Sequence, residues 1–371
     1  MARGDVWRAW LALKMVRGIG NVLGLSLVRA FGSAEAVFAA SRHALECAGL
    51  RRDAAVAIGN FAGWSEVDRQ LGRLHAVGGR LVTWEDESYP DNLRQIYDPP
   101  LFLFTRGEFQ AADRLAIAVV GTRSPSGYGR QMARILSEGL ARYGVTIVSG
   151  LARGIDAEAH AGALRVGGRT VAVLGSGIDV VYPSEHHQLL MNIIQHGCVV
   201  SELPMGTGPD AENFPGRNRI ISGLSLGVVV VEAAEKSGSL ITTQYALDQG
   251  REVFAVPGPV SPRSRGTHQL LRQGATLAEC SEDILNEAAP HAIAVVSAPG
   301  EPSLSGDEVR VYGAVDGTGT EVDRIIAATG LPARTVLDVL LRLELRGLVI
   351  QRPGKCFARP AARASSGADE R

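Results

Sequence analysis

Three short turns rich in small residues offer backbone N–H groups, hydroxyl groups and arginine side chains in a pattern that favours phosphate binding. The first extends from Gly121 to Gly129, the second from Ser149 to Asp156 and the third from Gly175 to Gly177. Free N–H groups at a helix N-terminus and a nearby guanidinium group can hold phosphate oxygens without a metal ion. The candidate phosphate-binding residues of these turns are Gly121, Thr122, Arg123, Ser149, Gly150, Arg153, Gly175 and Gly177.

A second segment, residues 214–222, combines an aromatic side chain with two arginines. Phe214 precedes a proline, and Arg217 and Arg219 flank Asn218. An aromatic ring beside arginines is a minimal unit for binding single-stranded nucleic acid, since the stacking of one base contributes roughly 1–3 kcal/mol. A polar turn follows further along the chain and leads into another helical pattern. The candidate strand-binding residues of this region are Phe214, Arg217, Asn218, Arg219, Ser222, Ser237, Gly238 and Ser239.

The same pattern excludes several common chemistries. The turn that begins at Gly121 matches neither the dinucleotide fingerprint Gly-x-Gly-x-x-Gly nor the phosphate loop Gly-x-x-x-x-Gly-Lys-Ser/Thr. Asp156 and His160 are four residues apart, but no third ligand stands at a spacing that suits a metal ion. Glu202 and Glu232 follow apolar runs, yet neither pairs with a nucleophile in the sequence. We therefore expect no cofactor, no metal ion and no catalytic residue.

These turns need a scaffold, and six apolar runs between residues 116 and 256 have the pattern of parallel strands. Each run stops at a small or polar residue and is followed by a helix-like stretch. In an open parallel sheet the carboxyl ends of the strands share one edge, where ligands bind. The runs are Ala116 to Val120, Val145 to Val148, Thr170 to Leu174, Cys198 to Val200, Gly227 to Val231 and Glu252 to Val256. The sequence thus predicts an α/β fold around such a sheet.

The chain of 371 residues is too long for one domain of typical size, and its composition changes along its length. Short helical patterns joined by glycine turns, such as the one from Val16 to Gly20, indicate a helix-hairpin-helix unit. Prolines between Trp84 and Gly107 predict an extended connector that leads into the sheet. The expected segments are a helical domain over 1–78, the sheet domain over 79–286, a flexible linker over 287–306, a winged-helix domain over 307–360 and a disordered tail over 361–371.

The winged-helix prediction rests on three helical patterns followed by a hairpin pattern. In many helix-turn-helix proteins the third helix binds DNA. Here the third helix presents Arg334 and Arg342 beside Asp338, so DNA contact, protein contact and internal packing all stay open for it. The helical patterns cover residues 307–315, 321–329 and 333–346, and the hairpin pattern covers residues 348–357.

Composition narrows the classes of protein to which the chain could belong. The net charge is -1 and charged residues make up 21%, so any contact with nucleic acid must depend on where individual arginines stand. The four cysteines include no Cys-x-x-Cys pair, which argues against a zinc site or a disulfide scaffold and favours a reducing compartment. No stretch of about 18 apolar residues occurs. We expect a cytoplasmic protein without a membrane span.

Several of these motifs occur together in one known family. They are Val120 to Arg123, Ser149 to Asp156, Val173 to Asp179, Tyr182-Pro183, Ser201 to Pro204, Phe214 to Ser225, Val231 to Ala233, Ser237 to Thr242 and Gly250 to Gly258. The set closely resembles the DNA-processing protein A family, DprA or Smf, and the resemblance spans about residues 8–286. It implies an extended Rossmann-like, doubly wound and mostly parallel sheet, flanked by a small helical N-terminal domain and a C-terminal winged helix.

The resemblance also implies a function. It implies a protein that is not an enzyme, but binds and protects single-stranded DNA, forms a homodimer and loads the RecA recombinase during natural transformation. Single-stranded-DNA-binding protein is a further expected partner. Carried over to this chain, Arg123, Arg217 and Arg219 would contact phosphates, Phe214 and Asn218 would face a base or sugar, and Ser149, Ser237 and Ser239 would support the strand. Where the family has an asparagine after Gly-x, this chain has His268, so one amide contact is in doubt.

Two other functions stay open on the residues. One is a nucleoside-monophosphate-cleaving enzyme on a similar sheet, with Glu202 or Glu232 as the acid, although the chain lacks the Pro-Gly-Gly-x-Gly-Thr turn of that class. The other is a winged-helix transcription regulator with a nucleotide-sensing core. Sequence-dependent binding of duplex DNA by residues 307–358 would favour the regulator, and release of free base from AMP would favour the enzyme.

Overall fold

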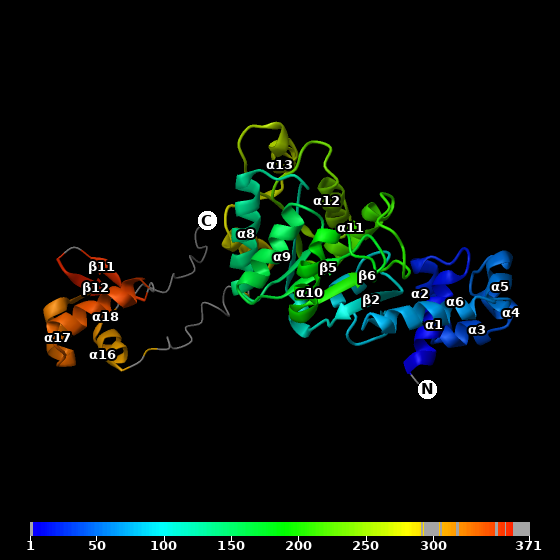
Figure 1. Cartoon of the computed structure of the whole chain (residues 1–371), viewed down its shortest axis with the longest axis horizontal. Helices are drawn as coiled ribbons and strands as arrows, with labels where there is room; N and C mark the ends of the chain where they lie inside the picture. The colour runs from blue at the N-terminus through cyan, green and yellow to red at the C-terminus, as the bar shows by residue number, and fades with distance from the viewer. Residues whose placement is uncertain are drawn as a thin grey trace, which may run out of the picture. The chain divides into compact units, whose positions relative to one another are not determined.

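The computed structural model describes residues 3–290, 292, 304, 306–316, 319–345, 348–352 and 354–358. The chain forms two compact units, residues 1–297 and residues 298–371 (Figure 1). The disordered tail expected over 361–371 lies outside the described residues, as does most of the linker expected over 287–306.

The first unit begins with six helices, as the glycine-turn pattern predicts. Gly32 ends α2 with a φ of 87°, a backbone conformation that glycine adopts without strain, and its N–H donates to the carbonyl of Val28. The hydroxyl groups of Ser33 and Ser41 cap the two helices that follow. The helices are α1 (Arg3–Met15), α2 (Asn21–Phe31), α3 (Ala34–Ala39), α4 (Arg42–Cys47), α5 (Arg52–Gly59) and α6 (Trp64–Ala76).

Nine strands form the sheet of the first unit, and they confirm the predicted α/β class. The strands are β1 (Arg80–Thr83), β2 (Phe102–Gly107), β3 (Ala116–Val120), β4 (Thr146–Ser149), β5 (Thr170–Val173), β6 (Cys198–Ser201), β7 (Gly227–Val230), β8 (Glu252–Ala255) and β9 (Thr276–Leu277). The six predicted runs are β3 to β8, each correct to within one residue at either end. The extended connector predicted over 84–107 is wrong in part, because its last six residues pair with β1 and β6 as strand β2.

The order of the strands reverses at β3. The sheet runs β1-β2-β6-β5-β4-β3-β7-β8-β9, with β3 to β9 parallel and with β1 and β2 antiparallel to their neighbours. From β3 the chain builds β4, β5 and β6 on one side, and it then returns to build β7, β8 and β9 on the other. Where connections leave a strand in opposite directions, a crevice remains at the carboxyl ends of the strands, and ligands bind there.

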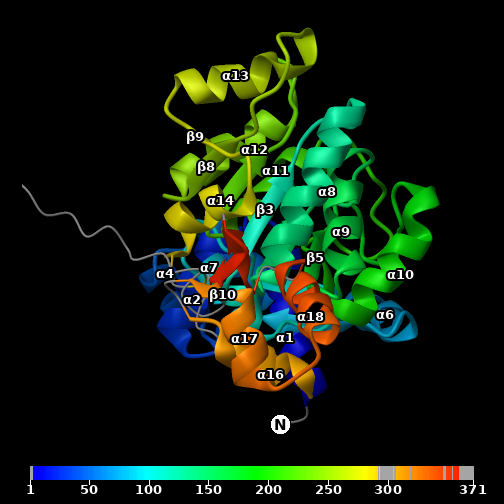
Figure 2. The ribbon, with the colours of Figure 1, turned by 90° about the vertical axis from the view of Figure 1, so that its left-hand side faces the viewer.

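Helices cover both faces of the parallel part of the sheet. On one face α8 (Gly127–Arg142), α9 (Ile155–Arg165) and α14 (Ser281–Ala288) pack on side chains such as Ile117 and Val119. On the other face α7 (Asp91–Arg94), α11 (Asn213–Gly223), α12 (Ser239–Asp248) and α13 (Arg265–Arg272) pack on the alternate residues Ala118 and Val120. Figure 2 shows α8 and α9 to the right of β3. Because both faces are buried, these strands read as unbroken apolar runs in the sequence.

The N-terminal helices share one hydrophobic core with the sheet. Trp10 and Leu74, fully buried, belong to the same cluster as Phe102 and Phe104 of β2 and residues of α10 (His187–His196). Figure 1 shows these helices at one end of the first unit, beside β2 and β6. The helical domain expected over 1–78 is therefore helical as expected, but it forms one compact unit with the sheet.

The second unit has the winged-helix architecture that the sequence predicts. It consists of α16 (Asp307–Ala314), α17 (Val322–Thr329) and α18 (Ala333–Leu345), with a sheet in which β12 (Cys356–Ala358) lies between β10 (Thr320–Glu321) and β11 (Ile350–Arg352). On the exposed face of α18, Asp338 and Arg342 pair with each other at 2.8 Å. Leu337 and Leu341 are exposed on the same helix, so neither DNA contact nor protein contact is singled out.

None of the described helices is long and apolar enough to cross a membrane.

A buried histidine lies in the first unit. His160 of α9 is fully buried, with Nδ1 at 2.6 Å from the hydroxyl oxygen of Thr170 and with Nε2 lacking a partner among the described residues. Burial, together with the smaller effect of the charges of His186 and Arg217, lowers the pKa of His160 to about 3. The imidazole is therefore neutral in the folded protein at neutral and mildly acidic pH.

We expect the free energy of unfolding to fall as the pH drops from about 6.5 toward 3, since the unfolded chain binds a proton at His160 that the folded chain excludes. One such proton gives a slope of about 1.4 kcal/mol per pH unit. Denaturant unfolding between about pH 7 and pH 5 should show a weaker pH dependence in His160→Gln than in the wild-type chain. The exposed-site control His187→Gln should follow the wild type. Equal pH dependence in His160→Gln and wild type would contradict this account.

Candidate functional site

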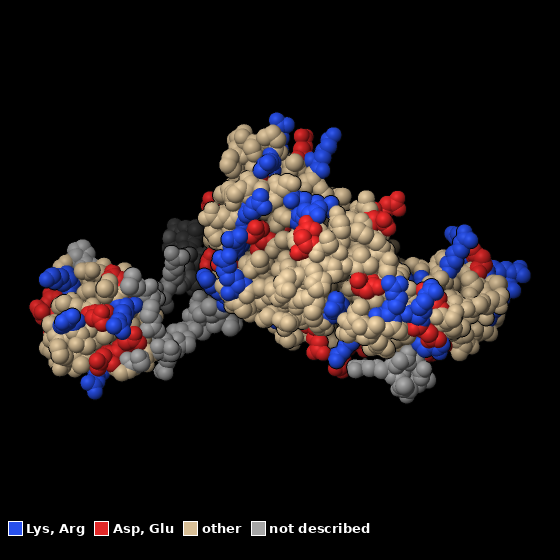
Figure 3. Space-filling model, viewed as in Figure 1, with Lys and Arg blue, Asp and Glu red and all other residues tan. Residues whose placement is uncertain are grey.

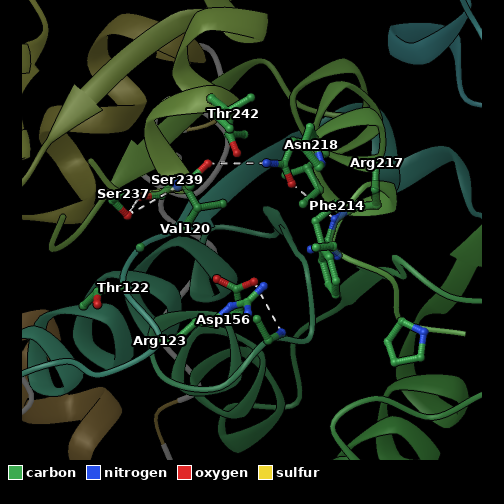
Figure 4. A pocket seen from close by; sticks show the side chains of 18 of the residues that line it. Val120, Thr122, Arg123, Asp156, Phe214, Arg217, Asn218, Ser237, Ser239 and Thr242 are labelled. Carbon is green, nitrogen blue, oxygen red and sulfur yellow. Dashed lines mark hydrogen bonds between the residues drawn. The ribbon is translucent and has the colours of Figure 1, made fainter. Parts of the chain in front are cut away.

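A cavity of about 460 Å³ lies at the carboxyl end of β3, where the strand order reverses. Figure 4 shows the side chains of Phe214, Arg217 and Asn218 on one side of it, with Ser237 and Ser239 across from them. The lining residues are Val120, Gly121, Thr122, Arg123, Ala152, Asp156, Tyr182, Pro209, Ala211, Phe214, Pro215, Arg217, Asn218, Ile221, Ser237, Gly238, Ser239, Ile241 and Thr242.

Segments far apart in the sequence meet around this cavity. Arg123 lies in the turn after β3, Asp156 in the first turn of α9, Phe214 in the first turn of α11, and Ser239 at the start of α12. Each segment connects a strand to a helix or begins a helix, and parallel strands bring such segments to one edge. The sheet therefore sets the distances between these side chains.

Phe214 forms an aromatic wall of the cavity, and two guanidinium groups lie over its ring. The Cζ atom of Arg123 is 5.0 Å from the ring centroid, and that of Arg217 is 5.6 Å from it. Tyr182 supplies a second ring, with its centroid 6.1 Å from that of Phe214. Tyr182 is absent from the predicted site residues, although its pairing with a following proline is one of the motifs that mark the family resemblance.

Arg217 is buried beneath the cavity, with 7% of its surface exposed. Its Nη1 donates to the carbonyl oxygen of Gly150 at 2.7 Å and also to that of Val173. Its Nε donates to Oδ1 of Asn218 at 3.3 Å. Burial lowers the pKa of Arg217 to about 10, and the nearby carboxylate of Asp156 acts in the opposite direction. The guanidinium group thus keeps its charge at neutral pH.

Asp156 is buried as well and binds the turn that follows β4. Its Oδ2 accepts the N–H of Gly150 at 3.1 Å and that of Ala152 at 3.4 Å. Burial raises the pKa of Asp156, while neighbouring cations and these backbone donors act against the rise. Between the two donors, Leu151 has a φ of 56°, in the left-handed region that residues with side chains rarely adopt. Surrounding groups must therefore hold this turn in a strained conformation.

The turn before α12 closes the cavity on another side. The hydroxyl oxygens of Ser237 and Ser239 are 2.7 Å apart, and Nδ2 of Asn218 donates to the carbonyl oxygen of Gly238 at 3.5 Å. Asn218 thus connects α11 to the turn after β7. Hydroxyl groups, an amide and guanidinium groups together provide both donors and acceptors around an aromatic ring.

Nine of the predicted site residues line the cavity, and seven do not. Those that line it are Gly121, Thr122, Arg123, Phe214, Arg217, Asn218, Ser237, Gly238 and Ser239. Those that do not are Ser149, Gly150, Arg153, Gly175, Gly177, Arg219 and Ser222.

Arg219 points away from the cavity, which corrects its predicted role as a phosphate contact. Its Nη2 lies 2.6 Å from Oε2 of Glu202, and its Nε lies 2.9 Å from Oδ2 of Asp98. Residues two apart on an α-helix point about 200° apart, so Arg217 and Arg219 cannot face the same side of α11. Arg219 belongs to a buried ion cluster and has 7% of its surface exposed.

Two predicted serines and one arginine are also engaged elsewhere. Ser149 and Ser222 are fully buried, and their hydroxyl groups donate to main-chain carbonyls, that of Ser149 to Val119 at 2.6 Å. These hydroxyls hold the scaffold together and cannot reach a strand in the cavity. Arg153 is exposed and pairs with Glu185 at 2.5 Å.

Three predicted glycines, which do not line the cavity, stand where a neighbouring group comes too close for a side chain. Gly150 accepts a guanidinium hydrogen bond through its carbonyl oxygen, as described above. At Gly175 an added Cβ would lie 2.9 Å from the ring of Phe214, and at Gly177 it would lie 2.7 Å from the carbonyl oxygen of Pro204. Only a residue without a side chain lets the aromatic ring and the neighbouring loop approach so closely.

The two glutamates of the enzyme alternative do not line the cavity. Glu202, besides its pair with Arg219, accepts hydrogen bonds from Nζ of Lys14 at 3.2 Å and from Nδ2 of Asn21 at 2.8 Å. Glu232 accepts the N–H and the hydroxyl of Ser126 at 2.8 and 3.1 Å, at the N-terminus of α8. Both carboxylates thus have structural partners.

His268 lies on α13 outside the cavity. Its Nε2 is 2.9 Å from the carbonyl oxygen of Gly258. Within the described part of the chain, no cluster of three or more His, Cys, Asp or Glu residues could hold a metal ion.

Comparison with known proteins identifies the family. The family model for DNA recombination-mediator protein A matches residues 80–289, and the model for the DprA winged helix domain matches residues 296–355. Protein Smf of Escherichia coli strain K12 is 43% identical over 297 residues, which cover 78% of this chain and 79% of that protein. Protein Smf of Synechocystis is 34% identical, covering 94% of this chain and 98% of the relative.

Solved structures agree with the sequence relatives. The X-ray structure of DNA processing protein A from Streptococcus pneumoniae has a TM-score of 0.62 and 33% identity, and it covers 78% of this chain and 98% of that one. DNA processing protein A from Helicobacter pylori, whose structure concerns a single-stranded DNA binding mode, has a TM-score of 0.51 and 31% identity, covering 56% of this chain and 94% of that one. With its sheet, its cavity and its winged helix, this chain belongs to the family of DNA recombination-mediator protein A, DprA or Smf.

Proposed function

We propose that the chain binds single-stranded DNA in the cavity at the carboxyl end of β3. The observation that supports this best is the Phe214 ring with the guanidinium groups of Arg123 and Arg217 over it. Aromatic rings stack on bases of any sequence, and arginines bind phosphate. The H. pylori relative, whose structure concerns single-stranded DNA binding, supports the same ligand class for this chain.

Two kinds of group in the cavity contact different parts of the strand. Exposed Arg123, with the hydroxyl of Thr122, faces the phosphates. Phe214 and the amide of Asn218 face a base or sugar. A base in a duplex is stacked and paired, so it would have to be unstacked and unpaired before it could enter, whereas an unpaired strand avoids this cost. We therefore expect a preference for single strands and little dependence on sequence.

Local charge must attract the strand, because the whole chain has a net charge of -1. Figure 3 shows lysine and arginine on the visible face over α8 and α13, with acidic residues between them. A surface of mixed charge attracts polyanions weakly at long range. Affinity should then depend on the few arginines at the cavity.

We infer a binding role without bond breaking. Cleavage of a nucleoside monophosphate would need Glu202 or Glu232 as the acid. Both side chains lie outside the cavity and make structural hydrogen bonds. A test of AMP turnover decides the point, since release of adenine by the purified chain would favour the enzyme instead.

We also propose that the chain acts as a homodimer which protects incoming single strands and loads RecA onto them during natural transformation. Membership of the recombination-mediator family supports this role. Single-stranded-DNA-binding protein is the competitor that such a mediator must overcome, which makes it a further partner.

Removing one cationic contact should weaken binding without sequence bias. Arg123→Ala should bind every single-stranded sequence less tightly and lower the slope of log affinity against log salt by about one. Fluorescence anisotropy with labelled oligo-dT over a salt titration measures both quantities. Arg142→Ala removes an equal charge from the last turn of α8, away from the cavity, and should leave affinity and slope as in the wild type. A wild-type slope for Arg123→Ala would count against the phosphate role.

Removing the aromatic wall should act through the bases alone. Phe214→Ala should lose the stacking of one base, roughly 1–3 kcal/mol or about 5- to 150-fold in affinity, with no change in salt slope. Phe214→Tyr keeps the ring and should bind like the wild type. On an abasic oligonucleotide Phe214→Ala and wild type should bind alike. A loss of equal size on the abasic strand would show that the ring does not meet a base.

Mediator activity has its own test. Light scattering should give the mass of a dimer, and the wild-type chain should shorten the lag before RecA hydrolyses ATP on DNA covered by single-stranded-DNA-binding protein. Arg123→Ala should keep the dimer and lengthen the lag, because loading depends on holding the strand. An unchanged lag with and without the wild-type chain would reject the loading role while leaving DNA binding untouched.

A further inference from the structure

Arg123 and Arg217 both lie over Phe214, but their surroundings differ. Arg123 is exposed, whereas Arg217 is buried and its Nη1 is committed to the carbonyl oxygens of Gly150 and Val173. Those two carbonyls stand at the carboxyl ends of β4 and β5. Turning the guanidinium group toward a phosphate would leave both buried acceptors without a donor, which is costly. Its hydrogen bonds therefore belong to the protein.

The turn after β4 is held from two directions. Arg217 binds its carbonyl oxygen at Gly150, and Asp156 accepts the N–H groups of Gly150 and Ala152. Leu151, fully buried, is held between them with a φ of 56°. A residue with a side chain keeps such a conformation only where its surroundings enforce it. The buried cation and the buried carboxylate supply that enforcement on the cavity floor.

The same guanidinium group reaches two other parts of the cavity. It lies 5.6 Å from the centroid of Phe214, whose ring lies close to Gly175. Its Nε binds Asn218, whose amide in turn donates to Gly238 in the turn after β7. One buried side chain thus contacts the ends of β4 and β5 and the aromatic ring, and it reaches the turn after β7 through Asn218.

We propose that Arg217 is a positioning residue for single-strand binding: with Asp156 it fixes the turn after β4, and it orients Phe214 for stacking on a base, while Arg123 supplies the charge that meets the phosphate. This inference rests on the proposed function. It changes the role that the sequence gives Arg217, and it places Asp156 in the binding machinery for the first time.

A salt titration separates positioning from phosphate contact. Arg217→Lys keeps the charge but cannot reach both carbonyls, so it should bind labelled oligo-dT about tenfold more weakly with the salt slope of the wild type. In a Phe214→Ala background it should cause little further loss, because both changes remove the same stacking. Wild-type affinity in Arg217→Lys, together with a slope lowered by about one in Arg217→Ala, would mark a phosphate contact and overturn the proposal.

Asp156→Asn tests the role of the carboxylate, because a purely electrostatic role and a positioning role predict opposite changes in affinity. If Asp156 matters only through its charge, removing a negative group beside the strand should tighten binding and raise the affinity. If it positions the turn, binding should weaken at an unchanged salt slope, as in Arg217→Lys. Thermal unfolding confirms that each variant is folded under the conditions of the titration. Tighter binding by Asp156→Asn would overturn its positioning role.

Arg123→Ala distinguishes failure of this inference from failure of the proposed function. Absence of single-strand binding by the wild-type chain, or an unaltered affinity in Arg123→Ala, would reject the binding site and this inference with it. A lowered slope in Arg123→Ala with unaltered binding in Arg217→Lys and Asp156→Asn would reject only the positioning role.

Discussion

The cavity at the carboxyl end of β3 depends on the reversal of strand order at that strand. The chain adds β4 to β6 on one side of this strand and β7 to β9 on its other side. Connections that run in opposite directions leave a crevice at the carboxyl end of the strand between them. Turns that are far apart in the sequence then converge at that point. Alternate residues of β3 pack on helices at opposite faces, as Val119 and Val120 do, and this packing keeps the strands and their turns at fixed spacing. The sheet therefore fixes the positions of the side chains that line the cavity.

The parallel core could be predicted from the sequence because strands buried on both faces are continuous apolar runs with polar ends. Six strands were recognisable for this reason. The first four residues of strand β2 are buried too, but the strand follows Pro99 and Pro100, which favoured an extended connector. The shared core of the N-terminal helices and the sheet was not predictable, since apolar positions such as Trp10 and Leu74 do not indicate which neighbour covers them.

The sequence indicated which residue types would gather at the cavity, but it did not indicate which way each side chain points. The motif around Arg217 and Arg219 places one arginine under the cavity and the other in an ion cluster with Glu202, a difference that helical periodicity would reveal. Pro215 argued against a helix in this segment, although a proline in the first turn of a helix breaks no helical hydrogen bond. Burial of Arg217 could not be read from the residue type, because it depends on carbonyl groups brought near by other strands.

The two ends of the chain are attached in different ways. The N-terminal helices bury residues in the core of the sheet, and Lys14 of α1 pairs with Glu202, the residue that follows β6. The winged helix closes its own core around Val311, Leu340 and Phe357. Removing the C-terminal unit would therefore leave the core of the sheet closed, whereas removing the N-terminal helices would expose apolar side chains of β2 and α10 to water.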